Sequence, residues 1–281
     1  MNQTIVFIHG AWMTPKCWEP FESFFTSRGY SCQAPAWPYH DRPIDELRAS
    51  PDPGLKQLGL GEIIDHYAQI VQQLPEPPIL IGHSFGGLVT QVLLDRGIGA
   101  AGVALDPAPP RGILAAAYPT TTRALLRIIA AAYPTTTRAL LRVIVTPGGW
   151  RKVFHWSLGE FSYAFVNTLP PDEQKRAYDE FVVPESGRLF FQNAFSALNA
   201  RTPGQINFKN GHRAPLLITA GTKDHIVPAR MVRANFLKYS QQSGTITEYQ
   251  EFPGGTHWLI AQPGWEMVAG SVETWLRKHL S

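Results

Sequence analysis

Short aliphatic runs alternate with amphipathic segments along most of this 281-residue chain, and that alternation limits the fold more than any other feature. Strands buried in a parallel sheet are continuous apolar runs, and the helices that connect them are amphipathic. We therefore predict an α/β fold with a mostly parallel, doubly wound sheet. The expected strands are 4–10, 30–36, 77–84, 101–107, 215–221 and 246–253. The expected helices include 61–74, 86–97, 227–237 and 264–280.

One long interruption breaks the series of strands. From about Pro107 to Arg213 the sequence shows helical pattern and loops but no convincing buried strand. Because this interruption stands between two late strands, we predict a helical cap that is inserted over one end of the sheet. The cap would comprise residues 107–213, and the core would comprise residues 1–106 and 214–281.

Aromatic residues are concentrated in the second half of the predicted cap. Eleven lie between residues 150 and 195, where the chain average of 11% would give about five. Packing of the cap interior explains most of them, and the lining of an apolar substrate pocket explains the rest. Trp150 and Trp156 of this segment, together with Trp12 near the N-terminus, are the candidate substrate-binding residues.

A tandem repeat lies within the predicted cap. AAAYPTTTRALLRII at 115–129 is followed by AAAYPTTTRALLRVI at 130–144, and the copies differ only at Ile128 and Val143. Two copies are too few for a solenoid. A 15-residue step turns the second copy by about 60° around a helix axis, and Pro134 disfavours helix at the residue before it. We therefore expect two short helices or one sharply kinked helix.

The segment GHSFG, which begins at Gly82, matches the pattern G-x-S-x-G and joins an expected strand to an expected helix. In this pattern the serine sits on a tight, strained turn, and its neighbours must lack bulk. The turn would present the Ser84 hydroxyl above the sheet. It would also leave the backbone N–H of Phe85 free at a helix N-terminus, where developing negative charge is favoured. Ser84 is therefore the candidate nucleophile.

A serine nucleophile needs a general base, and the base needs an acid that orients it. Asp224 and His257 each follow the end of an expected strand, where open α/β sheets place their sites. The chain order Ser84, Asp224, His257 is the order expected for this kind of site. Asp106 is an alternative acid, although it can also be interpreted as part of a stiff turn. His225 is a weaker base candidate because it precedes the final strand.

The loop FIHGAW after the first strand is the candidate for a second oxyanion donor. Gly10 would permit a tight turn, after which the backbone N–H of Ala11 or Trp12 would face the site. His9 and His83 are interpreted as structural histidines, because one precedes this glycine and the other should point away from the nucleophile.

The Gly82–Gly87 turn, the HGAW loop, Asp224 and His257 together resemble the α/β-hydrolase fold superfamily, in its cap-bearing, esterase-like branch. The resemblance covers residues 4–106 and 214–280 well and says little about the predicted cap. Haloalkane dehalogenases and epoxide hydrolases resemble the same fold but carry aspartate at the nucleophile position. The serine of this chain argues against both.

The resemblance implies a role for each site residue. Ser84 would be the nucleophile, His257 the base and Asp224 the acid, and the N–H groups of Ala11 and Phe85 would form the oxyanion hole. No metal and no organic cofactor are expected. The expected partner is a small-molecule carboxylic ester or lactone, apolar and possibly bulky.

Two further hypotheses keep the same fold. The triad can also cleave a carbon–carbon bond next to a carbonyl or transfer an acyl group, and the sequence does not separate these reactions because the distinguishing groups lie in the cap. A non-catalytic ligand-binding protein is the more remote hypothesis. Such proteins often lose a triad residue, whereas all three are present here.

Composition indicates a globular protein without a nucleic-acid footprint. Hydrophobic residues make up 44% of the chain, the formal net charge is +3, and the 25 Lys and Arg residues are scattered. Cys17 and Cys32 are too few for a disulfide framework in a chain of this length and are expected to be free thiols. No apolar run approaches 20 residues and no leader pattern precedes the first strand, so we expect a cytoplasmic protein without a membrane span.

Overall fold

The structure, a computed structural model, describes residues 3–113, 134–199, 201–242 and 244–280. Six strands form one sheet in the order β2-β1-β3-β4-β7-β8, and every neighbouring pair is parallel. This confirms the predicted α/β fold and its sheet. The strands are β1 Thr4–Ile8, β2 Ser31–Gln33, β3 Ile79–His83, β4 Ala101–Leu105, β7 Leu216–Gly221 and β8 Thr247–Phe252.

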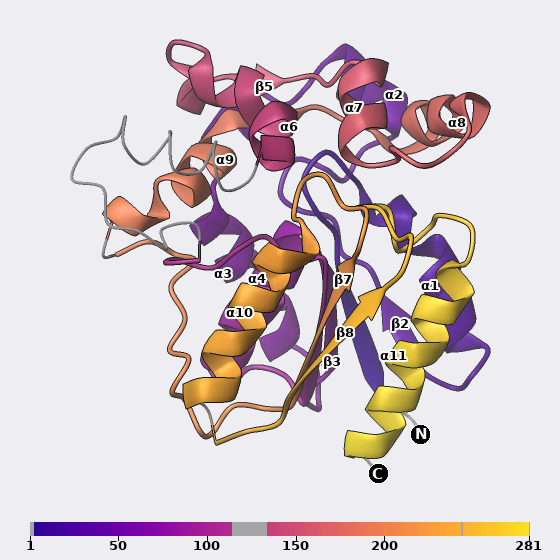
Figure 1. The fold of residues 1–281 in the computed structure, drawn as a ribbon, viewed down its shortest axis with the longest axis vertical. Coiled ribbons are helices and arrows are strands. Elements are labelled where there is room, and N and C mark those ends of the chain that lie inside the picture. Colours follow the sequence, from indigo (N-terminus) through magenta and orange to yellow (C-terminus); the bar gives the residue numbers. More distant parts are fainter. Residues whose placement is uncertain (1–2, 114–133, 200, 243, 281) are drawn as a thin grey trace.

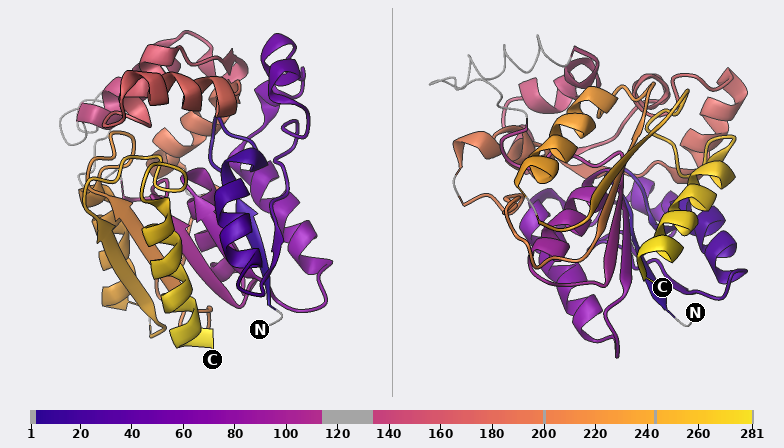
Figure 2. Two further views of the ribbon diagram at one scale, coloured as in Figure 1. Left: turned by 90° about the vertical axis from the view of Figure 1, so that its right-hand side faces the viewer. Right: turned by 60° about the horizontal axis from the view of Figure 1, so that its bottom comes forward.

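Helices cover both faces of the sheet, as a doubly wound fold requires. Helices α1 and α11 lie on one face, and α3, α4 and α10 lie on the other (Figures 1 and 2). The bounds of these helices are α1 Glu19–Thr26, α3 Leu60–Gln72, α4 Phe85–Asp95, α10 Ala229–Gln242 and α11 Trp265–Leu280. Because both faces are covered, every residue of β3, β4 and β7 is buried, which explains their continuous apolar sequences.

The described helices between β4 and β7 are α6 Pro134–Val145, α7 Leu158–Ala164, α8 Pro171–Phe181 and α9 Gly187–Ala194. Of these, α6, α7 and α8 lie in a layer above the carboxyl ends of the strands (Figure 1). Helix α2, Ile44–Ala49, extends from the core toward this layer (Figure 1). Short 3₁₀ turns complete the chain at Pro15–Trp18, Leu55–Gln57, Gly149–Arg151 and Ser196–Leu198.

The prediction for this segment was helices and loops with no convincing buried strand, and its described part also contains one short two-stranded ladder. Strands β5, Val153–Phe154, and β6, Glu185–Ser186, pair antiparallel as a separate two-stranded ladder. Two residues per strand are too few to show the alternation by which a strand is recognised in sequence. The pairing itself joins segments that are about thirty residues apart, so only the tertiary structure reveals it.

The repeat is described only in part. Residues 115–129 and 130–133 lie outside the described residues, and so does the expectation of two short helices or one kinked helix across both copies. The described part of the second copy is α6, which begins at Pro134. Proline suits the first position of a helix because the N–H that it lacks would have no intrahelical partner there.

The two cysteines are free thiols, as predicted. Burial raises the pKa of the Cys17 thiol well above its ordinary value, so this thiol stays protonated at neutral pH. Across the part of the chain that the structure describes, no helix combines the length and the apolar character needed to cross a bilayer.

Candidate active site

Ser84 lies on a sharp turn between β3 and α4. Its φ is 56° and its ψ is −120°, a strained conformation that a serine rarely adopts. Close packing holds the turn in place, because a Cβ added to Gly82 would lie 2.1 Å from the carbonyl oxygen of Gly86. A Cβ added to Gly86 would lie 2.0 Å from the carbonyl oxygen of Ile8. The sequence argument that both neighbours must lack bulk is correct.

His257 is oriented by Asp224. The Nδ1 atom of His257 lies 2.6 Å from Oδ2 of Asp224, and both side chains are fully buried. The other carboxylate oxygen accepts hydrogen bonds from the N–H groups of Ile226 (2.6 Å) and Val227 (2.8 Å). Because the carboxylate only accepts, Nδ1 of His257 carries the hydrogen and Nε2 keeps its lone pair.

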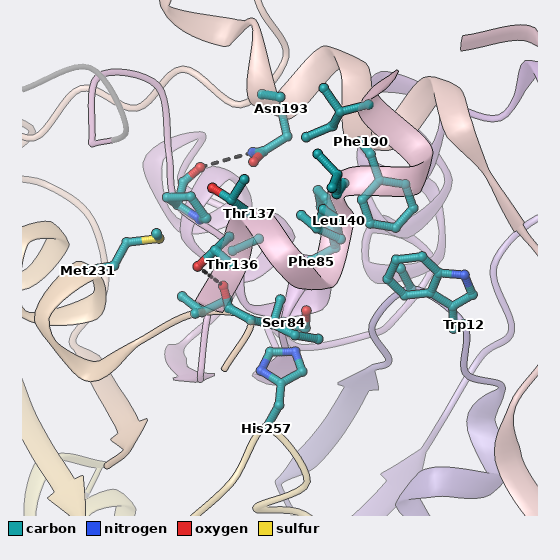
Figure 3. A pocket seen from close by; sticks show the side chains of 18 of the residues that line it. Trp12, Ser84, Phe85, Thr136, Thr137, Leu140, Phe190, Asn193, Met231 and His257 are labelled. Carbon is teal, nitrogen blue, oxygen red and sulfur yellow. Dashed lines mark hydrogen bonds between the residues drawn. The ribbon is translucent and has the colours of Figure 1, made fainter. Parts of the chain in front are cut away.

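Ser84 and His257 are neighbours in the site, and the second ring nitrogen of His257 is free. Within the described ranges Nε2 has no hydrogen-bond partner. Ser84 and His257 line the same cavity, and Figure 3 shows the imidazole ring directly below the serine. A base that is oriented on one side and free on the other is the arrangement that proton transfer from a hydroxyl requires, and such contacts often tighten only when substrate is bound.

Asp106 lies close to this pair but is not hydrogen-bonded to His257. Its Oδ1 accepts from the N–H of Gly221 at 2.6 Å, while Oδ2 has no partner among the described residues. Burial, followed by the charge of Asp224, raises the pKa of Asp106 well above its ordinary value. The carboxylate that is hydrogen-bonded to His257 is that of Asp224, so the geometry favours Asp224 over Asp106.

The other candidate histidines are held by structural contacts. The Nε2 atom of His83 donates to the carbonyl of His257 (2.7 Å), and burial holds the pKa of His83 well below its ordinary value. His225 donates through Nδ1 to a backbone carbonyl of α7 (2.8 Å). His9 stacks on Trp37, with ring centroids 4.6 Å apart, and accepts a hydrogen bond from its N–H (3.1 Å).

Two backbone N–H groups are available to a developing oxyanion. Ala11 and Phe85 line the cavity with Ser84, and neither N–H has a hydrogen-bond partner in the part of the chain that the structure describes. The N–H of Trp12 instead donates to Oε2 of Glu185 at 3.4 Å. The choice between Ala11 and Trp12, which the sequence left open, therefore falls on Ala11.

The sequence analysis expected Gly10 to permit a tight turn in the loop that carries Ala11, but the structure gives Gly10 a different role. Gly10 is not the residue with the unusual backbone: the positive φ in this loop, 63°, belongs to Trp12. Gly10 is required for space, because an added Cβ would lie 2.8 Å from Cβ of Ser84. The loop therefore lies directly against the nucleophile.

A cavity of about 310 Å³ opens above Ser84 and His257. Among the described residues its lining is aliphatic and aromatic except for two threonines and Asn193, and it contains no charged side chain. Thr136 donates to a backbone carbonyl at 2.6 Å, and Asn193 donates to the carbonyl of Pro109 at 3.0 Å (Figure 3). These two donors are thus already used within the protein, whereas the hydroxyl of Thr137 has no hydrogen-bond partner among the described residues. Apart from this hydroxyl and the Ser84–His257 pair, the cavity presents a largely apolar surface to a ligand.

Comparison with known proteins identifies the family of this chain. The sequence matches the Alpha/beta hydrolase family over residues 5–266. The chain belongs to the α/β-hydrolase family. A comparison with curated protein sequences gave no significant match to this hydrolase.

The solved structures that resemble this α/β-hydrolase cover nearly its whole length. The monoacylglycerol lipase of Paleococcus ferrophilus is 21% identical, with a TM-score of 0.64 over 99% of this chain and 97% of the other. A pyrethroid hydrolase from Sphingobium faniae JZ-2 is 17% identical, with a TM-score of 0.61 over 98% and 97%. Tomato methylketone synthase I is 12% identical, with a TM-score of 0.64 over 99% and 98%. At these identities the likeness establishes the fold.

The three tryptophans predicted to bind substrate occupy different places in the hydrolase. Trp12 lines the cavity. Trp156 stacks on the Trp12 ring, with centroids 3.5 Å apart, and lies behind it rather than in the cavity wall. The structure does not bring Trp150 to the site: it is 48% exposed and lines a separate groove with Arg151 and Arg188.

Sequence reasoning missed the contribution of α6 to the cavity. Thr136, Leu140 and Ile144, which are four residues apart, line it, and so do Thr137 and Leu141. This spacing is the signal that was present in the repeat, since residues at i and i+4 share one face of a helix. The second copy of the repeat thus supplies a wall of the candidate active site.

Proposed function

We propose that this α/β-hydrolase is a serine esterase that cleaves uncharged, apolar carboxylic esters. One observation carries the proposal. Asp224 is hydrogen-bonded to His257 at 2.6 Å, the Nε2 atom of His257 is free, and His257 and Ser84 line the same largely apolar cavity. This arrangement fits acyl transfer through a serine.

In the proposed reaction Ser84 attacks the ester carbonyl while Nε2 of His257 takes the hydroxyl proton. The N–H groups of Ala11 and Phe85 donate to the oxyanion that forms on the carbonyl oxygen. The C–O bond of the ester then breaks, and the protonated Nε2 gives its proton to the departing alcohol. Water then attacks the acyl carbon while Nε2 takes its proton. The bond between the acyl carbon and Oγ of Ser84 breaks, Nε2 returns the proton to Oγ, and the acid leaves.

The cavity supports the substrate class. Its volume of about 310 Å³ lies at the lower end of the range for small-molecule sites, which suits a compact apolar group. A charged substituent in the cavity would lose its hydration without gaining a charged partner, which disfavours its binding. Two of the structurally similar proteins are named as a lipase and a pyrethroid hydrolase, which agrees with hydrolysis of apolar molecules. Lactones fit the same chemistry because the triad treats them as cyclic esters.

A fluorophosphonate probe tests the nucleophile. We expect it to label the wild-type protein and not Ser84→Ala, and we expect Ser84→Ala to lose about 10⁶-fold in turnover while keeping its melting temperature, because only a small hydroxyl is removed. Labelling of Ser84→Ala to the wild-type extent would refute the assignment.

A panel of esters and lactones tests the reaction class. Pairs of equal size, one with an apolar acyl group and one with a terminal carboxylate, should differ by at least about tenfold in kcat/KM in favour of the apolar member. A wild-type protein that is labelled at Ser84 but cleaves no ester or lactone would be a carbon–carbon hydrolase or an acyltransferase with the same triad. A protein that is not labelled at all would be a ligand-binding protein on this fold.

A further inference from the structure

The backbone at Trp12 is strained and is held by the cap. Its φ of 63° is unusual for a bulky residue and marks a strained backbone. Both of its backbone groups bond to one short segment of the cap. The carbonyl of Trp12 accepts from the N–H of Val183 at 3.0 Å, and the N–H of Trp12 donates to Oε2 of Glu185 at 3.4 Å. The cap therefore binds the loop that carries Ala11.

Glu185 is a carboxylate with no access to solvent or substrate. Its side chain is fully buried, and Oε1 accepts from the N–H of Ser186 at 2.6 Å. It does not line the cavity above Ser84. A buried carboxylate is costly unless it is paired, so its partners indicate what it does.

His40 supplies the pairing charge from a third segment of the chain. Its Nδ1 lies 3.1 Å from the carbonyl oxygen of Pro38, which can only accept, so Nδ1 carries a hydrogen. Its Nε2 lies 3.4 Å from Oε2 of Glu185, and both side chains are buried. Nε2 makes no direct hydrogen bond among the described residues, so its contact with Glu185 is an ion pair that requires Nε2 to carry a proton.

Two other titratable groups, His9 and Asp41, lie near His40. His9, whose ring centroid is 5.7 Å from that of His40, is neutral, because burial and the neighbouring His40 hold the pKa of His9 well below its ordinary value. Asp41 and Glu185 both favour a charged His40. Burial is the largest single influence and lowers the pKa of His40, but Glu185, the carbonyl of Pro38 and Asp41 together outweigh it, so the pKa is raised.

We infer that Glu185, held by His40, is a positioning residue for the oxyanion hole. The pair joins the cap, the 38–40 segment and the strained Trp12, and so holds the Ala11 N–H against Ser84. The inference rests on the proposed function, because an oxyanion must form for this N–H to matter. Since the charge on the carbonyl oxygen develops only after attack, the pair acts on the transition state rather than on substrate binding.

Glu185→Gln is the test. The side chain keeps its size but loses its charge, and its amide cannot accept from both Trp12 and Ser186 while also pairing with His40. We expect kcat on a neutral ester to fall by about 10- to 100-fold, less than the loss of a whole oxyanion donor, with KM within about threefold. The second-order rate of fluorophosphonate labelling should fall in parallel, while the final stoichiometry of labelling stays at the wild-type value.

Glu180→Gln is the matched control. Glu180 also links the cap to the core, through an ion pair with Lys16 at 3.2 Å, but it is partly exposed and does not contact Trp12. We expect its kcat and labelling rate to equal those of the wild type. An unchanged kcat in Glu185→Gln, a change confined to KM, or an equal loss in Glu180→Gln would overturn the inference. A wild-type protein that the probe does not label would instead overturn the proposed function.

A pair of His40 variants decides the question if Glu185→Gln does not fold. In His40→Gln the amide nitrogen can take the place of Nε2 and donate to Glu185, whereas His40→Ala leaves the carboxylate unpaired. We expect His40→Gln to keep at least about ten times more kcat than His40→Ala, at equal labelling stoichiometry. Equal kcat in the two variants would overturn the inference.

Discussion

Replacing Asp224 by Asn should reverse the tautomer of His257. The carboxylate has two separate duties, since Oδ1 accepts from the N–H groups of Ile226 and Val227 while Oδ2 accepts from Nδ1 of His257. The amide of Asn has one acceptor and one donor. Its oxygen must stay with the two backbone N–H groups, because the amide nitrogen would face donors there. The amide nitrogen therefore faces Nδ1 of His257.

A donor facing Nδ1 moves the imidazole hydrogen to Nε2, the atom that must accept the proton of Ser84. The geometry is kept, but the base is lost. We expect kcat to fall by about 10⁴-fold, which corresponds to about 5.5 kcal/mol of transition-state stabilisation. The melting temperature should change by only a few degrees, since both backbone N–H groups keep their acceptor.

Asp106→Asn is the matched control. Burial and the nearby charge of Asp224 raise the pKa of Asp106, and among the described residues only its Oδ1 has a hydrogen-bond partner, the N–H of Gly221. The amide oxygen of Asn can keep that hydrogen bond, so kcat should stay within about tenfold of the wild type. Steady-state kinetics on a chromogenic ester, with fluorophosphonate labelling to count active sites and ¹⁵N NMR to identify the imidazole tautomer, measures all three proteins.

A larger loss in Asp106→Asn than in Asp224→Asn would refute this reasoning. The charge that orients His257 would then come from the end of β4 rather than from the loop after β7. An Asp224→Asn protein that kept wild-type kcat with Nε2–H visible by NMR would show that His257 is not the base.

Three further predictions follow from the same contacts. Gly86→Ala should lower the free energy of unfolding by at least about 3 kcal/mol, because its Cβ would lie 2.0 Å from a carbonyl oxygen of β1. Gly211→Ala is the control and should leave stability nearly unchanged, since its Cβ would meet open space. Equal melting temperatures for the two variants would contradict this. Leu140→Phe should reduce kcat/KM on the longer acyl esters at least about tenfold and spare acetyl esters, and a uniform loss would argue against an acyl site along α6. The difference in free energy of unfolding between the wild type and Glu185→Gln should be largest below pH 6.5 and should shrink as pH rises through the raised pKa of His40. A difference that denaturant titrations find independent of pH would contradict the ion pair.

The core and the assignment of site residues to strand ends could be predicted because both depend on local signals. Buried parallel strands are apolar along their length, and the six expected strands appear in the sheet, although β2 ends at Gln33 rather than at residue 36. Ser84, Asp224 and His257 each follow a strand, and the carboxyl ends of parallel strands meet at one edge. Strand order was not needed to place the three residues together.

The remaining features depend on contacts between distant segments. Trp12, His40 and Glu185 are separated by up to 173 residues, and none of them carries a local signal that points to the others. An aromatic-rich segment predicts burial on average, but it does not say which ring faces the cavity. Trp150 and Trp156 illustrate this, since one is exposed at the cap edge and the other is buried behind Trp12.

The contacts of Trp12 with Val183 and Glu185 have a consequence for protein engineering. One way to change the substrate range of such a protein is to replace its cap with the cap of a relative and to leave the core intact. In this protein such a chimera would remove the two residues that hold the loop beside the nucleophile and would strand His40 in the core without its counter-ion. A graft that retains residues 183–185 together with the 38–40 segment would keep the contacts that hold Trp12 in place. Some residues of the exchanged segment would therefore affect the rate of the reaction, and others only the choice of substrate.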